Sequence, residues 1–302
     1  MASIRPSLLA SLFLWLLASN AQAQAYERAR IDGLLLCRPS RTFTYAVATS
    51  PGHPTPEERA AIQAAVNTWR QAASSCSDLV FEQTADVTDG TLTFGDGRAL
   101  IIIRPRLCRD VVPEGQVCNP HEPCVDEYGC WAFGSDEVVN ASATFRYTTG
   151  EIVGAHIALN SSNGTLSTVD SPPCAPGTHA PDCVSGDVQS LMTRSIGEAL
   201  GFALVDRLDS TMARRLDWGD TQKRVIDPGT LQGLCELYPR GQPTPGCAIQ
   251  SPPDAGTPGG TDGGVNPPKE EEPAPSKGGC GAAPTVPLLG ALVLWLAARR
   301  RR

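Results

Sequence analysis

Side chains able to do chemistry gather in one short segment, residues 193–212. A cation, a hydroxyl and a carboxylate stand within about one helical turn of each other there, as Arg194, Ser195 and Glu198. Residues four apart are neighbours on a helix surface, so Arg194 and Glu198 are placed to form an ion pair. As an exposed surface pair it would contribute at most about 0.5 kcal/mol. A nucleophilic Ser195 is a weaker interpretation, because no nucleophile-elbow motif surrounds it.

The order of residues in this segment, TRSIGEALGFALVDRLDSTM from Thr193 to Met212, resembles the zinc helix and Met-turn of metzincin peptidases. In that family the pattern H-E-x-x-H-x-x-G-x-x-H supplies three imidazole ligands for zinc and a glutamate that acts as general base. In this register the four positions that carry the chemistry, His, Glu, His and His, are taken by Arg194, Ser195, Glu198 and Leu204. The two positions that shape the scaffold match the family: they are Gly201 and Met212.

The four substitutions remove the chemistry that the resemblance would otherwise imply. A guanidinium has no lone pair to give a metal, and a serine hydroxyl does not accept a proton as a glutamate does. One carboxylate, Glu198, remains where three imidazoles are needed. We therefore expect no catalytic residue, no metal and no cofactor here, with zinc present only if an unusual ligand set operates. The Arg194–Glu198 pair would then plug the vacant metal position, or else be the surface pair described above.

The helix that carries these residues is predicted to begin at an Asp187 N-cap. Its apolar side chains cluster on one side at about 100° per residue, namely Val188, Leu191, Met192, Ala199 and Leu200. Arg194, Glu198 and Gly201 fall on a different face, away from this apolar stripe.

An earlier helix has clear boundary signals. Thr55 is a candidate N-cap, Pro56 takes a first-turn position, and Glu58 completes a capping box. A last helix is predicted to open at Asp227 and Pro228. Runs rich in β-branched or alternating residues predict strands, namely 42–48, 79–81, 99–103, 143–147 and 152–159, the last two forming a hairpin.

The resemblance covers most of the predicted folded part. The helix at 56–73, the strand at Gly150–Asn160, the central helix, the turn at Met212 and a closing helix follow matrixin order, and they look like the cysteine-bearing secreted matrixin-like proteins of myxobacteria. The implied fold is α/β and metzincin-like. It has a twisted, mostly parallel sheet packed on two long helices, then a Met-turn and a C-terminal helix, with disulfide staples.

Both ends of the chain look like targeting segments. Residues 1–23 have the charged, apolar and small-residue order of a secretory signal peptide. Residues 24–240 would form the domain, and residues 241–277 a Pro, Gly and acid-rich linker. The tail, 278–302, has a Cys after two Gly, a short apolar run and four Arg, which resembles the myxobacterial sorting tails called MYXO-CTERM. It implies processing or lipid attachment at Cys280 and display at the outer membrane; a simple membrane anchor is the alternative.

Eleven cysteines suit an exported protein, since disulfides persist outside the cytosol. Ten of them lie between Cys37 and Cys247, apart from Cys280, and predict five bridges: Cys37, Cys76, Cys108, Cys118, Cys124, Cys130, Cys174, Cys183, Cys235 and Cys247. Short spacings favour Cys174 with Cys183 and Cys235 with Cys247, and Cys37 with Cys76 is our longer candidate. Cys118, His121, Cys124 and Cys130 also have a spacing compatible with zinc, but disulfides are the preferred interpretation.

The charge of the chain limits the classes of partner that it can bind. The formal net charge is −7, and removal of both end segments leaves 20 basic against 32 acidic residues. Such a chain lacks the basic footprint that nucleic-acid binding needs. The sequence thus predicts a secreted, surface-displayed matrixin-like protein without catalytic activity, whose cleft binds an extracellular peptide or protein. The alternatives are an active zinc endopeptidase with an unusual ligand set and a structural protein of the cell envelope.

Overall fold

The computed structural model describes residues 26–88, 96–120, 122–134 and 137–247. Four predicted features lie outside these ranges: the predicted signal peptide, the predicted sorting tail with Cys280, the part of the predicted linker beyond residue 247, and His121. Within them, no helix has the length and apolar content to cross a bilayer.

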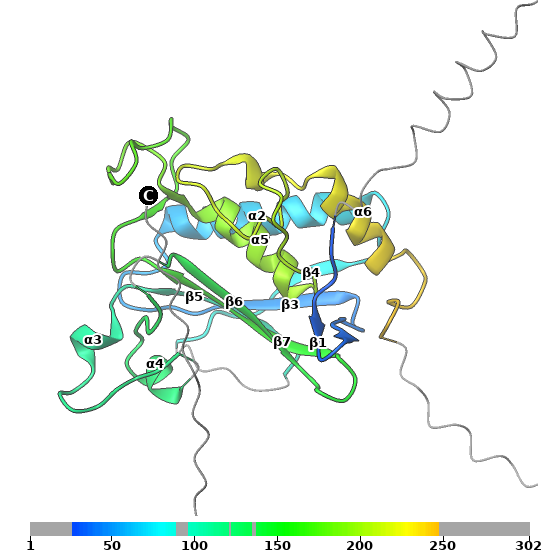
Figure 1. Cartoon of the computed structure of the whole chain (residues 1–302), viewed down its shortest axis with the longest axis horizontal. Helices are drawn as coiled ribbons and strands as arrows, with labels where there is room; N and C mark the ends of the chain where they lie inside the picture. Colours follow the sequence, from blue (N-terminus) through cyan, green and yellow to red (C-terminus); the bar gives the residue numbers. More distant parts are fainter. Residues whose placement is uncertain (1–25, 89–95, 121, 135–136, 248–302) are drawn as a thin grey trace, which may run out of the picture. The chain divides into compact units, whose positions relative to one another are not determined.

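A five-stranded sheet forms the centre of the fold (Figure 1). Its strands, in spatial order, are β4 (Val80–Gln83), β3 (Thr42–Val47), β5 (Ala99–Arg104), β7 (Ile152–Asn160) and β6 (Val139–Phe145). The first four run parallel, and β6 pairs antiparallel with β7 at one edge. The predicted mostly parallel α/β sheet is therefore confirmed, including the hairpin that ends it. The strand predicted at 143–147 begins and ends earlier, at 139–145.

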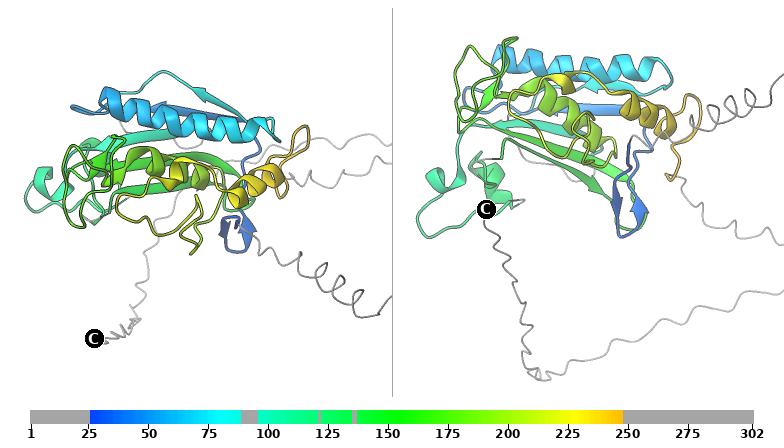
Figure 2. Two further views of the ribbon diagram at one scale, coloured as in Figure 1. Left: turned by 90° about the horizontal axis from the view of Figure 1, so that it is seen from above. Right: turned by 45° about the horizontal axis from the view of Figure 1, so that its top comes forward.

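Two helices, α2 (Pro56–Ser74) and α5 (Val188–Ala199), pack on one face of this sheet (Figure 2). Alternate strand residues such as Ile101 and Ile157 meet them in a wholly buried core with Trp69 at its centre. The period of two along each strand selects which side chains enter this core. A third helix, α6 (Pro228–Leu237), follows the turn that contains Met212.

The predicted helix caps are all present. The hydroxyl of Thr55 accepts from the Glu58 backbone N–H, and the Glu58 carboxylate accepts from the Thr55 N–H at 2.7 Å. Asp187 caps α5 through the Ser190 N–H, and Asp227 caps α6. Short polar side chains satisfy the first helical donors here, which is why these boundaries follow from local sequence.

A smaller core covers the opposite face of the sheet around Trp131. It lies beside two short helices, α3 (Cys108–Val111) and α4 (Pro123–Glu127). The remaining short elements are β1 (Arg30–Ile31), β2 (Leu34–Leu35), β8 (Leu166–Ser167), β9 (Gly186–Asp187) and the 3-10 helix η2 (Gln222–Arg224).

Five disulfides link the ten cysteines up to residue 247, as predicted, but only one of the proposed pairs is right. The bonds are Cys37–Cys247, Cys76–Cys235, Cys108–Cys130, Cys118–Cys124 and Cys174–Cys183.

The pairs Cys37–Cys76 and Cys235–Cys247 were wrong. The end of α2 meets the end of α6, where Ser77 bridges Pro239, so Cys76 finds Cys235 and not a cysteine nearer in sequence. Cys247 then returns to Cys37 and extends the fold past the expected boundary at residue 240.

Candidate functional site

The four degenerate positions lie on and just after α5, inside the molecule. Arg194 is only 7% exposed and Ser195 is fully buried. Leu204 is half-buried and packs against the main core. The interpretation of Arg194 and Glu198 as an exposed surface pair is therefore wrong: the face of α5 that carries them is covered by the chain at residues 213–214.

Arg194 is held by the segment that follows the turn. Its Nη1 donates to the carbonyl oxygens of Ala213 and Arg214 at 3.4 and 3.2 Å. Its Nε lies 3.6 Å from Oε1 of Glu198. The predicted ion pair is present, and the guanidinium occupies the space between α5 and residues 213–214.

Hydrogen bonding within this cluster is incomplete. Nε of Arg194, Oγ of Ser195 and Oε1 of Glu198 are buried and find no partner among the described residues. A 3.6 Å approach is an electrostatic contact, since a hydrogen bond between these atoms requires a distance nearer 2.9 Å.

Burial sets the protonation of the pair. Desolvation raises the pKa of Glu198 to about 7, although the charges of Arg194 and Arg214 act in the opposite direction. Desolvation likewise lowers the pKa of Arg194, and Glu198 opposes this shift. In both groups the loss of water outweighs the attraction of the partner. The Glu198 carboxylate therefore takes up a proton at a higher pH than an exposed glutamate does.

The turn below α5 is built around Met212, which is fully buried. A Cβ placed on Gly197 would lie 2.4 Å from its sulfur and 3.0 Å from the Trp69 ring. Glycine at 197 therefore permits the close approach of turn and helix. Asp227 fixes the turn by accepting from the Thr211 N–H at 2.7 Å and from the Ser210 hydroxyl at 3.2 Å.

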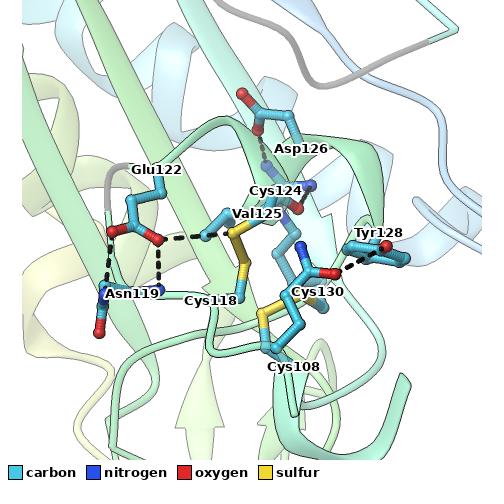
Figure 3. The surroundings of a disulfide bond; sticks show 11 residues. Cys108, Cys118, Asn119, Glu122, Cys124, Val125, Asp126, Tyr128 and Cys130 are labelled. Carbon is cyan, nitrogen blue, oxygen red and sulfur yellow. Dashed lines mark hydrogen bonds and ion pairs between the residues drawn. A yellow bond between two sulfur atoms is a disulfide. The ribbon is translucent and has the colours of Figure 1, made fainter. Parts of the chain in front are cut away.

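Three cysteines form the group nearest to a metal-ligand set, and Figure 3 shows them with their disulfide bonds. The sulfurs of Cys108, Cys118 and Cys130 all lie within 4.8 Å of one another. Each is already bonded in a disulfide, to Cys130, Cys124 and Cys108 respectively, so no thiolate is available to a metal. The disulfide interpretation of this spacing is confirmed.

One cavity lies on the face of the sheet opposite α2 and α5, and another lies among the loop residues 107–118 and 131–133. The first, of about 600 Å³, is lined by Arg104, Asn140 and the half-buried His156, among others. The second, of about 390 Å³, lies beside the Cys108 bridge and Trp131.

His53 takes part in a group that sequence reasoning missed. Its Nδ1 lies 2.8 Å from Oε2 of Glu58, and its Nε2 lies 3.4 Å from Oγ of Ser161. The only local signal was the five-residue spacing of His53 and Glu58. Ser161 is 108 residues further along than His53, and no sequence pattern connects them.

His179 packs on the Trp218 ring. Asp206 and Asp209, near the turn, pair with Arg214 and Arg207.

Comparison with known proteins does not assign this chain. No protein-family model matches it, and no curated protein matches its sequence.

Proposed function

We propose that this chain is a secreted, surface-displayed, matrixin-like domain that does not carry out zinc-dependent peptide hydrolysis and that binds an extended peptide at the edge of its sheet. Secretion and display rest on the end segments of the sequence. The family resemblance is supported by the mostly parallel sheet, the two long helices on one face, the turn at Met212 and the closing helix.

One observation carries the loss of metal chemistry: the buried guanidinium of Arg194. It lies beside Glu198 and donates to two backbone carbonyls, so a positive charge fills the place where the resemblance would put a cation. A divalent ion next to it would meet repulsion in a poorly solvated site. It would also find one carboxylate and no imidazole at the four positions, which is too few ligands for catalytic zinc.

The test is the metal content of the full chain, isolated from an exporting host and incubated with zinc. We expect less than stoichiometric zinc after dialysis and no chelator-sensitive cleavage of an unfolded protein such as casein. Stoichiometric zinc together with chelator-sensitive cleavage would overturn the proposal.

A matched gain-of-function variant checks the register. It carries Arg194→His, Ser195→Glu, Glu198→His and Leu204→His together, and we expect it to take up about one zinc per chain. The control with Arg194→His alone should remain free of zinc. Failure of the fourfold variant to bind zinc while its circular dichroism stays native would contradict the assigned register.

The proposed peptide surface is the free edge of β6, which has no further strand beside it among the described residues. Asn160 N–H donates to Val138 O, so this opposed pair is hydrogen-bonded. Opposed pairs alternate in an antiparallel ladder. In the observed register Ala141 and Ala143 therefore direct their N–H and C=O groups away from β7. Outward groups of this kind pair with an added strand.

A single proline tests this edge. Ala143→Pro removes one outward N–H without breaking a hydrogen bond to β7. We expect it to weaken the binding of fluorescein-labelled casein at least about tenfold, measured by fluorescence anisotropy, while Ala143→Ser binds like the natural chain. Equal binding by Ala143→Pro, or no binding by the natural chain at 100 µM casein, would eliminate the β6 edge as the binding surface.

A further inference from the structure

We infer that Ser161, His53 and Glu58 form a hydroxyl–imidazole–carboxylate site able to transfer acyl groups from small activated esters. This site shares no residue with the Arg194 cluster and goes beyond the peptide-binding function proposed above.

The three side chains are hydrogen-bonded in sequence. Both carboxylate oxygens of Glu58 lie close to Nδ1 of His53, at 3.0 and 2.8 Å. Nε2 of the same ring lies 3.4 Å from Oγ of Ser161. Nucleophile and base are often this far apart when no substrate is bound, and the distance shortens in the complex.

Glu58 determines which ring nitrogen of His53 can act as a base. A carboxylate only accepts, so the proton of a neutral imidazole lies on Nδ1 and the lone pair of Nε2 faces the Ser161 hydroxyl. Glu58 is 7% exposed, and its position is fixed by the Thr55 N–H at 2.7 Å. The capping box of α2 thereby holds the carboxylate that orients the ring.

The three residues meet where the parallel strands end. Ser161 directly follows β7, and its N–H donates to the carbonyl of Arg104, the last residue of β5. His53 lies in the loop after β3, and Glu58 lies in the first turn of α2. Ligands of open α/β sheets bind outside the carboxyl ends of the strands, which is this edge.

Reagents can reach the nucleophile. Ser161 and His53 are both half-buried, and the His53 side chain is 20% exposed. The Ser161 hydroxyl has the Arg104 carbonyl as an alternative acceptor, also at 3.4 Å. Rotation about its Cβ–Oγ bond is enough to direct the proton to His53.

The chemical step is acyl transfer. Oγ of Ser161 attacks the ester carbonyl carbon while its proton moves to Nε2 of His53. The tetrahedral intermediate collapses, the carbon–oxygen bond to the leaving group breaks, and the leaving oxygen takes the proton from His53. Water then repeats the two steps and releases the acid.

Activated esters suit this site better than peptides. The backbone N–H of Ser161 donates to the Arg104 carbonyl and that of Ser162 donates to Oδ1 of Asn160, so neither is free to bind a developing oxyanion and its stabilisation is modest. Esters with a good leaving group need least of it.

The experiment uses the full chain with a fluorophosphonate and with p-nitrophenyl acetate. The fluorophosphonate forms an oxygen–phosphorus bond and releases fluoride, and peptide mass mapping locates the adduct. We expect the adduct on Ser161. We also expect His53→Gln to lower the labelling rate and the kcat for the ester at least about 100-fold. Ser162→Ala, one residue further along, is the matched control and should label at the natural rate.

Glu58 is a positioning residue, because it acts through His53. Its test therefore needs a measurement that a change in the stability of the fold would not alter. Glu58→Gln keeps an acceptor for the Thr55 N–H, so the melting temperature should change little while kcat falls and KM stays constant. Glu58→Asp should recover part of kcat.

Two results would overturn the inference. The first is a chain with native circular dichroism that forms its adduct on another serine or forms no adduct. The second is an unchanged labelling rate in His53→Gln. Either result leaves the zinc measurements on the Arg194 cluster unaffected.

Discussion

At the scale of single residues, the Arg194–Glu198 pair illustrates the cost of burying charge. Each group loses hydration, and the 3.6 Å separation of Nε and Oε1 restores only part of it. Three buried polar atoms of the cluster have no hydrogen-bond partner among the described residues. Such a site gives up stability at neutral pH.

The stability of the fold should change with pH in the direction set by the raised pKa of Glu198. Folding raises the pKa of Glu198 from 4.5 to about 7, so between these pH values the folded chain binds more protons than the unfolded chain. The free energy of unfolding should therefore fall as pH rises from about 4.5 to 7, by up to roughly 3 kcal/mol. Urea unfolding with disulfides intact measures it.

The control variant is Glu198→Gln, which cannot titrate at this position. Its stability relative to the natural chain should increase with pH over the same window. A difference that stays constant between pH 4.5 and 7.5 would show that Glu198 does not carry the shift.

The ion pair illustrates what sequence can and cannot supply at this scale. The spacing of four residues was enough to predict that Arg194 and Glu198 meet. It could not predict their burial, because the covering chain at Ala213 and Arg214 belongs to a turn whose path depends on α6 and the core. The contact of His53 with Ser161 was also unpredictable, because the two residues are 108 apart in sequence and only the folded chain brings them together.

At the scale of elements, the close approach of α5 to the Met212 turn is the least tolerant contact of the candidate site. Gly197 leaves no space for a Cβ, and the neighbouring atoms belong to the fully buried Met212 and Trp69. Shape at this junction therefore outweighs the helix propensity of the residue.

Gly197→Ala should lower the free energy of unfolding by about 1–3 kcal/mol through overpacking. Helix propensity alone would raise the free energy of unfolding by about 1 kcal/mol, so the sign of the measured change tells overpacking from propensity. A double-mutant cycle with Met212→Ala separates the contact from other effects, since the cavity should accommodate the added methyl group. Strictly additive effects in that cycle would contradict the packing described.

Element boundaries were predictable because their signals are local. Thr55, Asp187 and Asp227 each lie within three residues of the backbone groups that they cap. The edge strand β6 was predicted a few residues too late, because its half-buried run of small and polar residues marks no clear beginning.

At the scale of the whole described fold, covalent links join segments far apart in sequence. Cys37–Cys247 spans 210 residues, whereas Cys118–Cys124 spans 6. Sequence spacing favoured short-range pairs, but the observed connectivity follows the fold, in which the end of α2 lies beside α6.

Removal of these two bridges should have unequal effects. In the chain-entropy description, replacing both cysteines of Cys37–Cys247 by Ser costs about 5 kcal/mol, and the same change at Cys118–Cys124 costs about 2 kcal/mol. Urea unfolding of the two double variants gives the order. A larger loss for the Cys118–Cys124 variant would mean that strain or local packing outweighs loop entropy.

The Cys37–Cys247 bond also has a mechanical consequence. It joins a residue near the start of the described fold to its last described residue, with the two Cα atoms 5.6 Å apart. A pulling force applied beyond residue 247 passes through this bond to Cys37 and bypasses the helices and strands between them. While the bond is intact, a force on the chain beyond residue 247 is carried by the Cys37–Cys247 disulfide, and the strands of the sheet are not pulled apart one after another.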